Sequence, residues 1–130
     1  MKDSVSAVII RDKDNKVFIG KRSLNKEYSP GEWETIGGRV EKGEKIEEAL
    51  EREVREELNV KIEKVRYFKD YSFDGRTFKH FIIKLKNEPK PNKEDFEDWG
   101  WFNREEIKNK EFAINCKEKL LDYFEYAKTK

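Results

Sequence analysis

The sequence predicts one globular domain that combines strands and helices, of the α/β or α+β class. Its 130 residues match the usual size of a single domain. Charged residues make up 44% of the chain and hydrophobic residues only 35%, but aromatic residues reach 13% and occur within short apolar runs. Because such side chains bury much apolar surface, they favour a folded core over a disordered chain.

Apolar runs of strand length, bounded by turn residues, predict two hairpins and a late single strand. They cover residues 4–10, 16–21, 61–73, 76–86 and 99–102. Asp74-Gly75, inside the second hairpin, is a typical hairpin turn. Residues 23–43 are expected to form a long loop around one short strand. Long loops in compact domains usually carry function, so this segment is a candidate site.

Three helices are expected. Strong helix formers without Gly or Pro cover residues 45–58, and Asn59 follows where a left-handed cap is wanted. Two more helices are expected after Asn103 and Asn115, each at a sequence that resembles a capping box. The final helix should turn an apolar face inward, formed by Cys116, Leu120, Leu121 and Phe124.

The charge balance argues against bulk nucleic acid as a partner. The chain has 29 Lys and Arg residues and 28 Asp and Glu residues, a net charge of +1. Its overall charge therefore produces no positive field that would attract a polyanion. No apolar run approaches the roughly 20 residues of a membrane span, and the start does not resemble a signal peptide. Cys116 is the single cysteine and has no partner for an internal disulfide. We therefore expect a cytoplasmic protein without membrane contact.

Three carboxylates share one face of the helix expected at 45–58. At about 100° per residue, Glu53, Glu56 and Glu57 lie within one sector of its surface. An apolar stripe lies beside them, formed by Leu50, Val54 and Leu58. The like charges repel, which suggests that they serve a ligand, although a solvated, salt-bridged helix is the alternative. Carboxylates suit Mg²⁺, which also binds substrate phosphates.

The run from Gly38 to Val60 resembles the Nudix box. That signature is Gly, five residues, Glu, seven residues, Arg-Glu, an aliphatic residue, any residue, Glu-Glu, any residue, Gly and an aliphatic residue. The matching positions are Gly38, Glu44, Arg52, Glu53, Val54, Glu56, Glu57 and Val60. Asn59 replaces the last Gly of the signature and is the next most tolerant residue of a left-handed cap. The resemblance covers nearly the whole chain and implies one Nudix hydrolase domain over residues 1–130, an α/β/α sandwich with a mixed sheet between helices.

The resemblance also implies roles for individual residues, with Mg²⁺ as cofactor and Mn²⁺ as the alternative ion. The implied metal ligands are the carboxylates of Glu53, Glu56 and Glu57 and the carbonyl of Gly37. Glu53 is also our choice of general base. Glu44 would support the metal site or face the helix dipole, and Arg52 would orient a box carboxylate. Glu94 and Asp95 are candidates for a further acid, unless they only solvate their loop.

Five residues are candidates for substrate binding. Arg22 and Arg39 would meet phosphates, or each could pair with a surface acid. Tyr28, Trp33 and Phe73 could stack on a base, although such aromatic residues more often belong to the core.

The expected activity is metal-dependent hydrolysis of a diphosphate linkage in a nucleoside diphosphate derivative. A MutT-like nucleoside triphosphate pyrophosphohydrolase or a broad housecleaning hydrolase leads, acting on a small nucleotide as a monomer or homodimer. An ADP-ribose or nucleotide-sugar pyrophosphatase is an alternative, but Gly75 stands where ADP-ribose members tend to have Pro. An isopentenyl diphosphate isomerase-like enzyme would need an active-site cysteine, and Cys116 is expected to lie far from the box. The last alternative is a non-catalytic nucleotide- or RNA-binding member, which usually lacks box glutamates.

Overall fold

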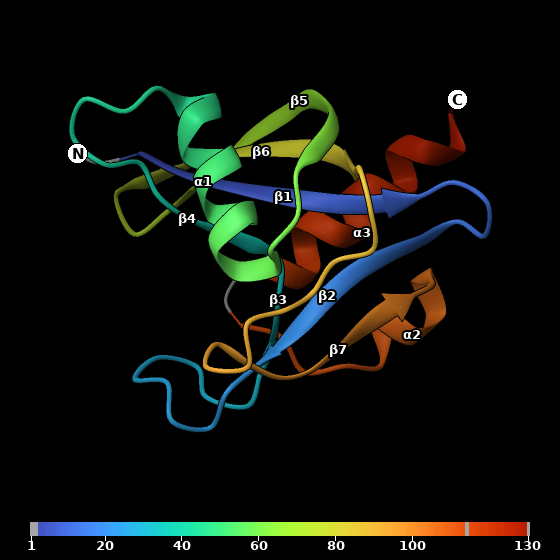
Figure 1. The fold of residues 1–130 in the computed structure, drawn as a ribbon. Helices are drawn as coiled ribbons and strands as arrows, with labels where there is room; N and C mark the ends of the chain where they lie inside the picture. Colours follow the sequence, from blue (N-terminus) through green and yellow to red (C-terminus); the bar gives the residue numbers. More distant parts are fainter. Residues whose placement is uncertain (1–2, 114, 130) are drawn as a thin grey trace.

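The computed structural model describes residues 3–113 and 115–129 (Figure 1). In chain order, these residues form β1 (Asp3–Arg11), β2 (Lys16–Arg22), β3 (Trp33–Glu34), β4 (Ile36–Arg39), α1 (Ile46–Leu58), β5 (Ile62–Phe73), β6 (Arg76–Leu85), β7 (Phe96–Phe102), α2 (Arg104–Lys108) and α3 (Cys116–Lys128). No helix within these residues is long and apolar enough to cross a membrane.

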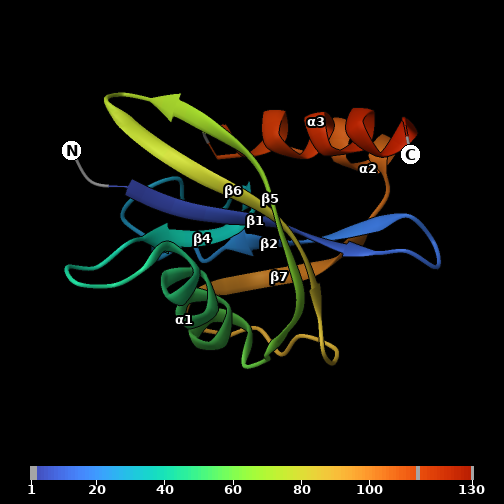
Figure 2. The same ribbon diagram turned by 90° about the horizontal axis from the view of Figure 1, so that it is seen from above.

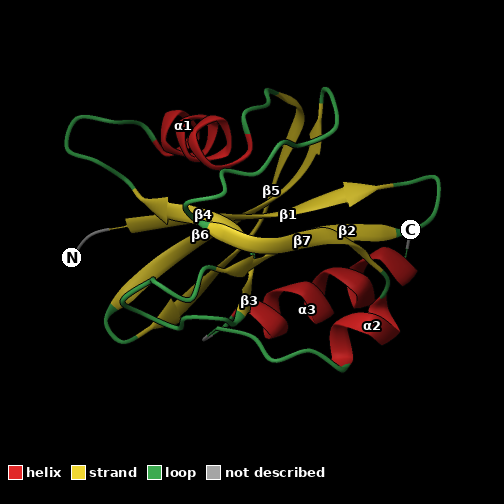
Figure 3. Ribbon diagram, turned by 60° about the horizontal axis from the view of Figure 1, so that its bottom comes forward, coloured by secondary structure: helices red, strands yellow, loops and turns green. Residues whose placement is uncertain are grey.

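The strands form a mixed sheet in the order β3-β2-β1-β6-β5, with β4 added to β1 and β7 added to β2. β1 and β6 pair in parallel, and the other strand pairs are antiparallel. α1 covers one face of the sheet, whereas α2 and α3 lie on the opposite face (Figures 2 and 3). The predicted α/β/α arrangement around a mixed sheet is therefore confirmed.

β1 and β2 contribute to two cores, because successive side chains of a strand point to opposite faces of the sheet. The α1 side holds Ala7, Ile9 and Phe18 with Leu50, Val54 and Leu58. The other side holds Val8, Val17 and Ile19 with Ile107, Leu120 and Phe124. The apolar stripe predicted on α1 thus docks the helix on the sheet and leaves its acidic face free for the site.

The predicted turns and caps are confirmed at three places. Asp74 and Gly75 both have positive φ, 51° and 74°, as a tight hairpin turn requires. Asn59 ends α1 in the left-handed conformation, with φ 53° and ψ 43°. Asn103 and Glu106 form the reciprocal hydrogen bonds of a capping box at the start of α2.

Three local predictions are corrected. The segment 23–43 contains two short strands rather than one, because β3 pairs with β2 and β4 pairs with β1. Asn115 does not form a capping box: its backbone is left-handed, with φ 67°, and its side chain accepts no cap hydrogen bond. A capping residue normally has an extended backbone, whereas the backbone of Asn115 is left-handed. β7 begins at Phe96, earlier than the predicted strand, because its pairing with β2 continues to Arg22.

Candidate active site

Four carboxylates from separate parts of the chain form one acidic cluster. Glu53 and Glu57 come from α1, Glu34 from β3, and Asp95 from the loop before β7. The charges of Glu34, Glu53 and Asp95 all raise the pKa of Glu57. This acidic cluster is therefore assembled by the fold, since only two of its members lie in the box.

Glu57 is the most enclosed member of the acidic cluster. Burial is the main reason why its pKa lies well above the usual range, and the charge of Glu34 follows as the next cause. A protonated Glu57 donates a hydrogen bond to Glu53. Burial also raises the pKa of Glu53, although Arg52 acts in the opposite direction. Among the described residues, Oε1 of Glu57 has no hydrogen-bond partner. A buried oxygen of this kind is costly unless a ligand satisfies it.

Arg52 connects the residues of the box to one another. Its guanidinium donates two hydrogen bonds to Glu44, at 2.7 and 3.0 Å, and one to Glu53 at 2.9 Å. It also reaches Glu56 at 3.1 Å and the carbonyl of Arg39 at 3.0 Å. The hydrogen bonds from Arg52 lower the pKa of Glu44. These contacts are the ones that the predicted orienting role of Arg52 would use.

Glu56 occupies a different position from the other two glutamates of its helix face. Its side chain is 56% exposed and is paired with Arg52, whereas Glu53 and Glu57 turn toward the acidic cluster. The helix face predicted from spacing is therefore divided, with two carboxylates enclosed and the third directed to solvent.

Gly38 allows α1 and β4 to approach each other closely. A Cβ at this position would overlap the carboxylate of Glu53, and a Cβ at Gly37 would overlap the carbonyl oxygen of Val5 in β1. A larger residue at Gly38 would displace the Glu53 carboxylate, whereas one at Gly37 would meet the backbone of β1. The two glycines thus allow β4 to lie close to β1 on one side and to the Glu53 carboxylate on the other.

Two cations close the far side of the acidic cluster. Arg22 donates to Glu34 at 2.8 Å and to the backbone carbonyl of Tyr28 at 2.8 Å, and Lys26 pairs with Asp95 at 2.5 Å. Burial nevertheless raises the pKa of Glu34, against the opposing charge of Arg22. Arg22 is therefore at the site, but an acid and a carbonyl already hold its guanidinium.

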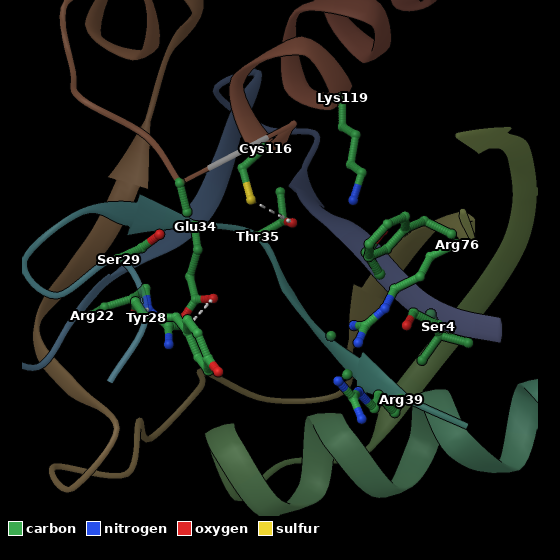
Figure 4. Close-up of a pocket in the computed structure, with 16 residues that line it drawn as sticks. Ser4, Arg22, Tyr28, Ser29, Glu34, Thr35, Arg39, Arg76, Cys116 and Lys119 are labelled. Atoms are coloured by element: carbon green, nitrogen blue, oxygen red, sulfur yellow. Dashed lines mark hydrogen bonds and ion pairs between the residues drawn. The ribbon is translucent and has the colours of Figure 1, made fainter. Parts of the chain in front are cut away.

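A cleft of about 510 Å³ adjoins the acidic cluster at Glu34 and Gly38. It lies on the α3 side of the sheet, where β1, β4 and β6 face the start of α3 (Figure 4). Of the predicted substrate residues, Arg22, Tyr28 and Arg39 line it. A cavity of this size, with apolar walls and a few charged groups, is typical of a small-molecule site.

The other candidates lie elsewhere. Trp33 is 9% exposed and packs edge-to-face on Phe102 at 5.3 Å, so its predicted role in base stacking is corrected to a role in the core. Phe73 lines a smaller hollow beside the cleft rather than the cleft itself. Glu94 is exposed, and its backbone bonds to the side chain of Asn92, whereas its neighbour Asp95 joins the acidic cluster.

Cys116 lines the cleft, although the sequence predicts a position far from the box. Thr35 donates a hydrogen bond to its sulfur at 3.6 Å. Burial raises the pKa of the Cys116 thiol, so it is not prepared as a thiolate nucleophile. Its presence at the cleft does not by itself support isomerase chemistry.

Sequence reasoning missed several residues that line the cleft: Glu34, Thr35, Arg76, Phe78 and Lys119. For Lys119 a signal was present, because the spacing of 116, 119, 120 and 123 puts it on the apolar face of the last helix. For Glu34 the pairing with Arg22 depends on how β3 meets β2, which the sequence does not reveal.

The acidic cluster fits a hard divalent cation. Within residues 3–113 and 115–129, no three Asp, Glu, His or Cys side chains already surround one point as metal ligands would. However, Glu57 offers an oxygen without a partner, and its neighbours are carboxylates whose repulsion a dication would offset. The donors are therefore of the right chemistry, and adjustment of side chains would complete the set.

Comparisons with known proteins agree with this fold. A family model described as the NUDIX domain matches residues 1–124. Nucleoside triphosphatase NudI of Escherichia coli is 31% identical over 125 residues, which cover 82% of this chain and 86% of that protein. A solved structure described as MutT from Aliivibrio salmonicida and Vibrio cholerae superimposes on this chain with a TM-score of 0.74. It is 27% identical, and the match covers 86% of this chain and 87% of that one. DR0079 from Deinococcus radiodurans has the same fold, with a TM-score of 0.79 at 22% identity over 93% of this chain and 82% of that one.

The family match, the sandwich fold and the carboxylate-bearing helix together indicate a hydrolase. The chain belongs to the Nudix hydrolase family, as the match over residues 1–124 shows. Members of this family generally use divalent metal ions, and the predicted box is confirmed as the sequence that builds the acidic face.

Proposed function

We propose that this protein hydrolyses nucleoside triphosphates to nucleoside monophosphates and pyrophosphate, with Mg²⁺ as its metal. One observation carries the proposal: Glu57, whose buried Oε1 has no partner, lies in a four-carboxylate cluster at the edge of a cleft large enough for a nucleotide. The likeness to NudI, a nucleoside triphosphatase by name, supports the choice of triphosphates.

Glu53, Glu57 and the Gly37 carbonyl would hold the Mg²⁺, and Glu56 would join them on leaving Arg52. Bound there, the ion would neutralise charge on the substrate phosphates while water attacks phosphorus. Glu53 is our choice to take the proton from that water, because it is partly enclosed and hydrogen-bonded to Glu57. Asp95 is a further acid at the same cluster.

Arg39 is our choice for the first phosphate contact made by a side chain. It lines the cleft beside Gly38, and no ion pair occupies its guanidinium in the described structure. Arg22 would contribute less, because Glu34 already holds it at 2.8 Å. Tyr28 is 73% exposed where it lines the cleft and is available to stack on a base.

The position of attack tests this proposal. In ¹⁸O-labelled water with Mg²⁺, each nucleoside triphosphate should yield monophosphate and pyrophosphate, with the label in one of these two products by mass spectrometry. Glu57→Gln should remove most activity, whereas Glu51→Gln, on an exposed position of the same helix, should not. Orthophosphate with a nucleoside diphosphate as first product would contradict the proposal. ADP-ribose, nucleotide sugars and isopentenyl diphosphate should be tested in the same assay. If the protein turned over only one of these compounds, that compound would replace nucleoside triphosphates as the proposed substrate.

A further inference from the structure

Lys119 is the most enclosed cation of the cleft. It lies in the first turns of α3, its residue is only 3% exposed, and it lines the cleft. Its side chain extends from α3 into the cleft on the side away from Arg22 and Tyr28 (Figure 4). This position is separate from the acidic cluster and has no part in the metal chemistry described above.

Lys119 has aromatic neighbours but no acceptor. Its Nζ lies 4.4 Å from the ring centroid of Phe78 and 5.8 Å from that of Tyr71. No hydrogen bond or ion pair joins this ammonium group to any residue in the part of the chain that the structure describes. Lys26 and Lys79, by contrast, each meet a carboxylate. Burial of an ammonium without an acceptor is costly, and this cost lowers the pKa of Lys119.

The surroundings of Lys119 indicate which ligand group would meet it. Thr35 and Cys116 lie near Lys119 in the cleft and the ring of Phe78 contacts it, so the walls there are small or flat (Figure 4). The carboxylate of the cleft, Glu34, is held on the other side by Arg22. Arg76 also lines the cleft but is an exposed residue. A phosphate would need several enclosed donors, whereas one ammonium beside a ring face suits a planar base with a carbonyl oxygen at its edge.

We propose that Lys119 determines which bases the enzyme accepts, by donating a hydrogen bond to a carbonyl oxygen on the base. Nucleotides with a keto group at that edge, such as those of hypoxanthine and uracil, are then preferred over adenine and cytosine nucleotides. An amino group at the same position would face the ammonium donor to donor, and both would stay unpaired. This inference rests on the proposed function for the orientation of the nucleotide, with its phosphates at the acidic cluster.

Matched substrate pairs test the proposal. ITP and ATP differ at position 6 of the base, and UTP and CTP at position 4, while their phosphates are identical. The wild-type protein should favour the keto member by about tenfold or more in kcat/KM, mainly through KM, as expected for a hydrogen bond to a charged group. In Lys119→Met the preference should fall to about twofold or less, because the donor is lost. Lys128→Met, an exposed lysine of the same helix, should retain it.

Binding without metal separates this inference from the proposed function. With EDTA present, calorimetry should show tighter binding of IMP than AMP to the wild-type protein and similar binding of both to Lys119→Met. This preference without any triphosphate hydrolysis would remove the proposed function and support the role of Lys119. Hydrolysis with the same ITP to ATP ratio in wild type and Lys119→Met would overturn that role and leave the proposed function in place.

Two further results complete the test. If Lys119→Met raises KM equally for all four triphosphates, Lys119 contacts phosphate and the inference is wrong. Lys119→Gln keeps a donor but adds an acceptor, so it should accept amino and keto bases alike. Its circular dichroism spectrum and that of Lys119→Met should match the wild-type spectrum, because Gln and Met are close to Lys in size and neither buries a charge.

Discussion

The guanidinium of Arg52 holds the carboxylate of Glu44 in a two-pronged contact, from Nε to Oε2 at 2.7 Å and from Nη2 to Oε1 at 3.0 Å. Glu44 itself accepts the backbone N–H of Glu41 at 2.9 Å. The pair therefore joins α1 to the loop before it. Since Arg52 also donates to Glu53, the loop, the helix and a cluster carboxylate depend on one planar cation.

We first predict that Arg52→Lys lowers kcat/KM by about 10- to 100-fold, as is usual when the support of a metal ligand is lost. A lysine keeps the charge, but its single ammonium cannot hold Glu44 by two bonds and reach Glu53 as well. Steady-state kinetics with Mg²⁺ measure the effect. Glu44→Gln should cost less, and the double variant should resemble Arg52→Lys alone because both changes break one contact. Strictly additive losses would contradict this account.

The second prediction concerns Glu57. In the metal-free protein, Glu57→Gln should raise the melting temperature by a few degrees at pH 8, because it removes a buried charge repelled by Glu34, Glu53 and Asp95. The pKa of Glu57 is raised on folding, so its ionised form destabilises the protein as pH rises above the unfolded value. The gain should therefore shrink at pH 5. Melting curves in EDTA at the two pH values measure it.

The activity of the same variant should move in the opposite direction. Glu53→Gln and Glu57→Gln should each lose about 100-fold or more in kcat, as is typical of lost electrostatic catalysis. Addition of Mg²⁺ should stabilise the wild-type protein but not Glu57→Gln. Glu56→Gln, which removes an exposed carboxylate, should also lower activity but leave the EDTA melting temperature nearly unchanged. If both enclosed variants keep a tenth of wild-type turnover, the metal ligands have been assigned incorrectly.

The third prediction concerns Asn59, the cap of α1. Its backbone is left-handed, and its side-chain Nδ2 donates to the carbonyl of Lys90 at 2.8 Å. Asn59→Gly should change the free energy of unfolding by less than about 1 kcal/mol, because relief of the backbone offsets the lost hydrogen bond. Asn59→Val should cost about 2 kcal/mol or more, since it strains the backbone and loses the same bond. Urea unfolding distinguishes these outcomes, and equal stability of the two variants would refute the cap.

The fourth prediction is a pH dependence from His80. This side chain is fully buried, its Nδ1 is 2.7 Å from the hydroxyl of Ser6, and burial lowers its pKa to about 3. The unfolded chain binds a proton near pH 6.5 and the folded chain does not, so stability present above pH 6.5 is lost as pH falls toward 3. Between pH 6.5 and 4.5 this loss should reach about 2–3 kcal/mol. In urea titrations at the two pH values, His80→Gln should lose about 2–3 kcal/mol less of its free energy of unfolding than the wild-type protein. An equal loss in both proteins would count against a buried neutral His80.

Features that depend on neighbours along the chain could be predicted without the fold. The spacing of Glu53, Glu56 and Glu57 follows from helix geometry, and the turn at Asp74-Gly75 and the cap at Asn59 follow from backbone preferences of single residues. The Nudix box is also a local pattern, so it could be identified without the fold. For the same reason the strands and helices were predicted with small errors at their ends.

The contacts between distant segments depend on three-dimensional packing and could not be predicted in this way. Packing added Glu34 and Asp95 to the two enclosed glutamates, turned Glu56 to solvent, and buried Trp33 in the core. These outcomes depend on how β3 and the loop before β7 pack beside α1, and burial then sets the pKa of each carboxylate. The buried position of the Lys119 side chain likewise depends on how α3 packs against the sheet. Local preference fixes which residues form each element, whereas packing alone fixes which charges lose contact with water.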